Sequence, residues 1–127
     1  MTAHVLTPQR LVEWARQVVE VPEPVTVGLW SRAASLLGRQ ALEETVDAFW
    51  RKTEPAMEHV STRAQFLCLS QYLPDPALAR DMNAAWLAFT HACHYHPYEL
   101  PPTSGELLAW LETIDRMTKS VGPPEEP

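Results

Sequence analysis

The chain has 127 residues and a mass of 14.4 kDa, a size typical of a single domain. Apolar residues make up 46% and charged residues 20%, a composition too apolar for intrinsic disorder, and no apolar run approaches the roughly 18 residues that span a bilayer. The formal net charge is −6, so the chain lacks the excess of basic residues that is typical of proteins that bind duplex DNA. We therefore expect one soluble globular domain with no membrane segment and no affinity for duplex DNA.

The two cysteines, Cys68 and Cys93, form neither a CxxC pair nor a dense disulfide pattern, and each lies in an apolar, helix-like stretch. The first ten residues, MTAHVLTPQR, lack the apolar segment of a secretory signal. These features predict a cytoplasmic protein in which both cysteines are free thiols that pack as small apolar groups.

Twelve prolines divide the chain, because proline is accepted in the first turn of a helix but breaks a helix interior. Thr7 and Pro8 predict the N-cap and first residue of a helix over about residues 8–20. The proline-free stretch 27–53, rich in Ala and Leu, predicts a second helix about 40 Å long.

Capping signals predict two more helices in the middle of the chain. Thr62 and Gln65 form a capping-box pattern that opens a third helix, which we expect to run to about residue 72. Asp75 followed by Pro76 opens a fourth helix, expected to run to about residue 95.

The last part of the chain begins with a second capping box, Thr103 with Glu106, which predicts a fifth helix. Residues 119–127 contain Gly, Pro and Glu with little to bury, and they predict a disordered tail. There is no internal repeat and no strand pattern. We therefore expect an all-α fold, a compact five-helix bundle in a single domain over residues 1–118.

The fourth predicted helix has two distinct faces when its residues are placed at about 100° intervals. One face should enter the core and contains Leu78, Met82, Ala85, Trp86, Phe89 and Cys93. The opposite face is half apolar and contains Arg80, Ala84, Leu87, His91, His94 and Tyr95. An exposed leucine, a tyrosine and two histidines on one strip are typical of a surface that contacts another protein. We expect this face to form a homodimer interface, with a different protein partner as a further possibility.

Three of the five histidines lie in the segment HACHYHPYE, residues 91–99. His91 and His94 are spaced closely enough to hold one metal ion, and Cys93 or Glu99 could add a ligand. On a regular helix, however, Cys93 points away from both histidines, and no other segment identifies the missing ligands. We predict no metal site and no cofactor. For His96 two roles remain open, a structural one at the end of the helix and general acid–base chemistry.

The same segment resembles the ribonuclease motif of the HEPN superfamily, whose members are small helical proteins that usually dimerise. In that family an arginine is followed, after four to six residues, by a histidine, and in one toxin branch the pattern continues as His-x-Tyr. Here His96 and Tyr98 match the histidine and the tyrosine, while His91 stands where the arginine belongs. The stretch RQALE, residues 39–43, is similar to the Gln-Ala-x-Glu stretch in the second helix of many members.

The resemblance implies two alternative functions. In an active ribonuclease of this family, His96 would polarise the RNA 2′-hydroxyl or the leaving group, assisted by His91 and Tyr98 and without a metal. Replacing the arginine by His91 removes a permanently charged guanidinium that suits phosphate, and many HEPN-like modules are noncatalytic. We therefore expect a noncatalytic HEPN-like interaction or regulatory module that acts as a homodimer. A metal-independent endoribonuclease is the alternative, and only under it is RNA a partner.

Overall fold

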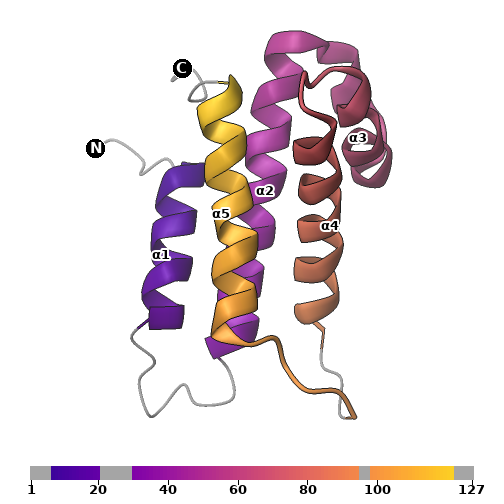
Figure 1. Cartoon of the computed structure of the whole chain (residues 1–127). Helices are drawn as coiled ribbons and strands as arrows, with labels where there is room; N and C mark the ends of the chain where they lie inside the picture. Colours follow the sequence, from indigo (N-terminus) through magenta and orange to yellow (C-terminus); the bar gives the residue numbers. More distant parts are fainter. Residues whose placement is uncertain (1–6, 21–29, 95–97, 122–127) are drawn as a thin grey trace, which may run out of the picture.

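The computed structural model describes residues 7–20, 30–94 and 98–121. Over these ranges the chain is helical with no strand, and five α-helices and two short 3-10 helices form a bundle (Figure 1). The elements are α1 (Pro8–Glu20), α2 (Trp30–Thr53), η2 (Pro55–His59), α3 (Thr62–Cys68), η3 (Leu69–Gln71), α4 (Pro76–Ala92) and α5 (Ser104–Val121). The expected all-α five-helix fold is confirmed.

Helix α2 lies at the centre of the bundle and packs against α1, α4 and α5, with α1 and α4 on opposite sides (Figure 1). Small residues on its buried face, Ala34, Gly38 and Ala41, let the neighbouring helices come close. The Phe89 ring of α4 lies directly over Gly38, where a Cβ would stand only 2.5 Å from two ring carbons. Any larger residue at this position would therefore overlap the Phe89 ring where α2 crosses α4.

Three of the predicted helix starts are confirmed by hydrogen bonds. The hydroxyl of Thr7 accepts from a backbone N–H in the first turn of α1 at 3.2 Å, and the carboxylate of Asp75 does the same for α4 at 2.9 Å. At the start of α5, Thr103 Oγ1 accepts from the backbone N–H of Glu106 at 3.1 Å, while Glu106 Oε1 accepts from the backbone N–H of Thr103 at 3.0 Å. This reciprocal pair is the capping box expected from the sequence.

The start of the third helix differs from the prediction. Ser61, not Thr62, is the N-cap, and its hydroxyl accepts from a first-turn N–H at 3.2 Å. Gln65 is not a capping residue: its side chain is buried and donates to the carbonyl oxygens of Met57 and Val60 at 2.8 and 3.1 Å. The burial of this amide sets the register, because it ties α3 to the preceding η2. Helix α3 then ends at residue 68 and continues as η3 rather than as α-helix to residue 72.

Two other boundaries also differ. Helix α4 ends at Ala92 with Cys93 as its C-cap, instead of running to about residue 95, because the Cys93 side chain is buried in the core and Arg32 binds its carbonyl. Helix α5 continues to Val121, three residues past the boundary expected at 118, because Val121 packs against the core. The rest of the expected tail, 122–127, lies outside the described residues.

The core face predicted for α4 is confirmed. Leu78, Met82, Ala85, Phe89 and Cys93 are buried, and Trp86 is half-buried and stacks on Phe66 of α3 with ring centroids 5.0 Å apart. Both cysteines are free thiols, and burial raises the pKa of Cys93. None of the described helices combines the length and apolar character needed to cross a lipid bilayer.

Candidate functional site

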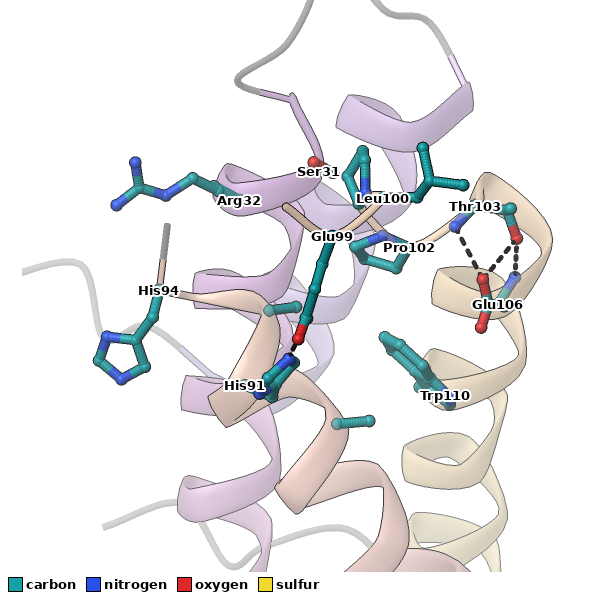
Figure 2. Close-up of a pocket in the computed structure, with 13 residues that line it drawn as sticks. Ser31, Arg32, His91, His94, Glu99, Leu100, Pro102, Thr103, Glu106 and Trp110 are labelled. Carbon is teal, nitrogen blue, oxygen red and sulfur yellow. Dashed lines mark hydrogen bonds and ion pairs between the residues drawn. The ribbon is translucent and has the colours of Figure 1, made fainter. Parts of the chain in front are cut away.

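A pocket of about 630 Å³ opens at the end of the bundle where α2 begins, α4 ends and α5 begins. Figure 2 shows it between the last turn of α4, the connecting loop to α5 and the first turns of α2 and α5. Its lining consists of Ser31, Arg32, Ala88, His91, Ala92, His94, residues 99–103, Glu106 and Trp110. Parts of the chain that are far apart in sequence thus meet beside the predicted histidine cluster.

The central polar contact at this pocket joins His91 to Glu99. Their Nε2 and Oε2 atoms lie 2.7 Å apart, and both side chains remain more than half exposed, at 59% and 56%. Figure 2 shows Glu99 extending from the loop toward the His91 ring at the end of α4. The contact therefore fastens the loop that leads to α5 against the last turn of α4.

Arg32 makes a second link, between the start of α2 and the end of α4. Its Nε donates to the carbonyl of Cys93 at 3.3 Å, which places a cation at the negative end of the α4 dipole. In Figure 2 the side chains of Arg32 and His94 extend to one side of the pocket, opposite Trp110 and Glu106. The basic groups thus lie toward one edge of the site.

The other side of the pocket is largely apolar, with the Glu106 carboxylate at its edge. Trp110 packs edge-to-face on Phe89 with ring centroids 5.4 Å apart, and the loop adds Leu100, Pro101 and Pro102 to the lining. Aromatic and proline side chains lose little conformational freedom when they are covered. This wall can therefore accept an apolar group, with the His91 and Glu99 side chains beside it.

The predicted interface residues that the structure describes are all exposed: Arg80, Ala84, Leu87 and His91 on α4, and His94 just past its end. Leu87 is 50% exposed and lies between Ala84 and His91 on this side of the helix. Tyr95, the sixth residue expected on this face, lies outside the described residues. The two-sided character predicted for α4 is thus observed along its described length.

Of the three residues expected under the ribonuclease alternative, only His91 is seen to line the pocket. His96 lies outside the described residues. Tyr98 is 99% exposed and is not part of the pocket lining. Within the described residues, no three His, Cys, Asp or Glu side chains gather closely enough to hold a metal ion.

Four residues that help to build the pocket were not predicted as site residues from the sequence: Ser31, Arg32, Glu106 and Trp110. Ser31 and Arg32 precede His91 by about sixty residues, and Glu106 and Trp110 follow the loop that closes the site. No local pattern marks such residues, because only the packing of α2 against α4 and α5 brings them together. The capping-box role predicted for Glu106 was the only available signal.

A separate row of charged side chains runs along α2 at intervals of four residues: Arg39, Glu43, Asp47 and Arg51. Arg39 Nε lies 3.5 Å from Glu43 Oε1. Partial burial raises the pKa values of Glu43 and Asp47 above their ordinary values, although the neighbouring arginines act in the opposite direction. Their charged forms are therefore less well solvated in the folded chain than in the unfolded chain.

Comparison of the chain with protein-family models, with curated proteins and with solved structures gives no match. The HEPN-like relationship therefore stays a prediction that depends on the motif residues and the order of the helices.

Proposed function

We propose that this chain is a noncatalytic, HEPN-like helical interaction module that acts as a homodimer through the exposed face of α4. The observation that supports the proposal is the two-sided helix itself: one face of α4 is buried in the core, while the opposite face exposes Leu87 between Ala84 and His91. Covering a half-exposed leucine and its neighbours is favourable by roughly 25 cal/mol per Å² of apolar area. This gain in free energy favours association through the exposed face of α4.

The environment of His91 supports a noncatalytic role. A group that stabilises phosphate charge acts most strongly where water is excluded, whereas the His91 side chain is 59% exposed. It also lies in contact with the Glu99 carboxylate, whose negative charge repels an approaching phosphate. The His91–Glu99 pair is better suited to holding the loop and contributing to a protein surface.

Sedimentation of a charged variant tests the proposal. We expect the wild type to sediment as a dimer at tens of micromolar, and Leu87→Glu to sediment as a monomer with its helicity retained, because the change adds a charge to the centre of the face. The matched control is Ala109→Glu on an exposed position of α5, which should remain dimeric. A wild type that is monomeric throughout this concentration range would contradict the proposal.

One observation favours the second candidate, a metal-independent endoribonuclease that uses His96 with His91 and Tyr98. An imidazole in contact with a carboxylate beside a 630 Å³ pocket is an arrangement that can move a proton. The test incubates labelled RNA with the wild type in EDTA between about pH 5 and 8, the range in which imidazoles titrate. Cleavage that disappears in His96→Ala would establish the enzyme, and absence of cleavage by the wild type would refute it.

A further inference from the structure

One row of exposed residues, opposite the core face of α4, runs along the helix and just past its end. Arg80, Ala84, Leu87, His91 and His94 are separated by four, three, four and three residues, the spacing of a coiled-coil seam. A small residue and a leucine occupy the middle of this row, and polar groups occupy both ends. Such a row fits against a second helix of the same kind.

The two ends of the row differ in charge. Arg80, near the start of α4, is exposed and forms no ion pair with another described residue. Near the other end, the Glu99 carboxylate lies against His91. The row therefore begins at a cation and ends beside a carboxylate, with His94 and Arg32 at the edge of the same pocket.

Resting on the proposed homodimer, we infer that two copies pair their α4 helices antiparallel about Leu87, so that Arg80 of the partner subunit joins the Glu99–His91 cluster at the pocket rim. In this arrangement the second copy contributes a residue to the site of the first, and the contact occurs twice by symmetry.

Helix geometry places the relevant residues opposite one another. In an antiparallel pair, a residue seven positions before Leu87 faces the residue seven positions after it in the other copy, and each lies about 10 Å from the two-fold axis at 1.5 Å per residue. Arg80 of the partner subunit then reaches the end of α4, where His94 and the Glu99 carboxylate lie. Ala84 lies opposite position 90 of the partner, next to the partner's His91, and its small side chain leaves room for the imidazole ring.

Charge complementarity favours this direction over a parallel one. Parallel pairing in register would place Arg80 against the partner's Arg80 and the two carboxylates together, which is repulsive. Antiparallel pairing puts each Arg80 beside the Glu99 carboxylate of the other copy. A single pair of helices is a small interface, so we expect association in the micromolar range.

A charge swap tests the register. Arg80→Glu and Glu99→Arg should each weaken dimerisation at least about tenfold, whereas the double variant Arg80→Glu, Glu99→Arg should restore it, because the opposite charges meet again across the interface. The matched control is Arg63→Glu, which reverses another exposed arginine that has no ion-pair partner among the described residues. Circular dichroism melts establish that each variant is folded. The double variant does not rebuild the His91–Glu99 contact, so recovery reports the contact between copies.

A cysteine scan gives an independent result. Leu87→Cys should form a disulfide-linked dimer on oxidation because the two residues meet near the axis, whereas Arg80→Cys should not link to itself. The wild type, with Cys93 buried and Cys68 half-buried, serves as the blank. If Arg80→Cys links as readily as Leu87→Cys, the antiparallel register is wrong. The register is also wrong if the wild type is a dimer but the charge-swap double variant does not recover dimerisation. In both cases the homodimer proposal still stands. A monomeric wild type refutes the homodimer itself.

Discussion

The close approach of α2 and α4 at Gly38 predicts the effect of a single methyl group. In Gly38→Ala the new Cβ would lie 2.5 Å from Cε1 and Cζ of Phe89 and 3.0 Å from its Cε2. Carbon atoms in favourable contact are about 3.5–4.0 Å apart, so the overlap is about 1 Å. Phe89 is fully buried and packs against Trp110, so its ring has little room to move away.

Two opposing effects decide the sign. Alanine in a helix interior is more favourable than glycine by about 1 kcal/mol. Inserting a methyl group into a packed core costs about 1–3 kcal/mol. Because the overlap involves two atoms of an immobile ring, we expect the upper part of that range. The net result should be a free energy of unfolding that is lower by about 1–2 kcal/mol, from the difference of these two effects.

Urea denaturation followed by circular dichroism measures this change. The matched control is Gly105→Ala in the first turn of α5, where the nearest atom to an added Cβ is Thr103 Oγ1 at 3.9 Å, and stability should be unchanged or slightly higher. In a double-mutant cycle, Phe89→Leu should cost less in the Gly38→Ala background than alone, by about 0.5 kcal/mol or more. A Gly38→Ala protein as stable as the wild type would refute the packing argument.

Three further predictions concern capping, a buried amide and pH. Thr103→Ala should lower the free energy of unfolding by about 1 kcal/mol because it removes half of the capping box with Glu106, measured by urea denaturation; an unchanged value would mean that α5 needs no cap. Gln65→Leu should cost about 1–3 kcal/mol in the same assay, since it leaves two carbonyl groups of the η2 region without their donor; thermal melts that coincide with the wild type would contradict this. Burial raises the pKa of Asp47 and outweighs Arg51, which acts in the opposite direction. The folded state therefore binds the proton of the Asp47 carboxyl group more tightly than the unfolded state does. The stability that this tighter binding contributes is fully present below pH 3.8, the pKa of the group in the unfolded chain. It is lost as the pH rises through the higher pKa of the folded chain. Asp47→Asn should therefore become more stable relative to the wild type as the pH rises through this window, and a difference that shrinks would contradict the sign.

The helix starts could be predicted from sequence where the signal is local. Thr7, Asp75 and Thr103 each cap a helix with a hydrogen bond that spans two or three residues, so the neighbouring sequence contains the whole interaction. The choice between Ser61 and Thr62 could not be made in this way. It depends on the burial of the Gln65 amide, which requires the fold of η2 as well as α3.

The faces of α4 could also be predicted, because a period of 3.6 residues separates the core side from the exposed side. The end of α4 could not, since it depends on Arg32 of α2 binding the Cys93 carbonyl across the bundle. The pocket was missed for the same reason: Ser31 and Trp110 meet only through the packing of α2 with α5 and α4. The contact between Glu99 and His91 was not predicted, because Glu99 was considered only as a possible metal ligand and the course of the loop decides where its carboxylate lies.

The molar mass of the wild-type protein at tens of micromolar, measured by sedimentation equilibrium, tests most directly whether the exposed face of α4 meets a second copy. We predict a mass near twice the 14.4 kDa of the chain, falling toward the monomer value on dilution into the low micromolar range. A mass of 14.4 kDa at every concentration would contradict the account.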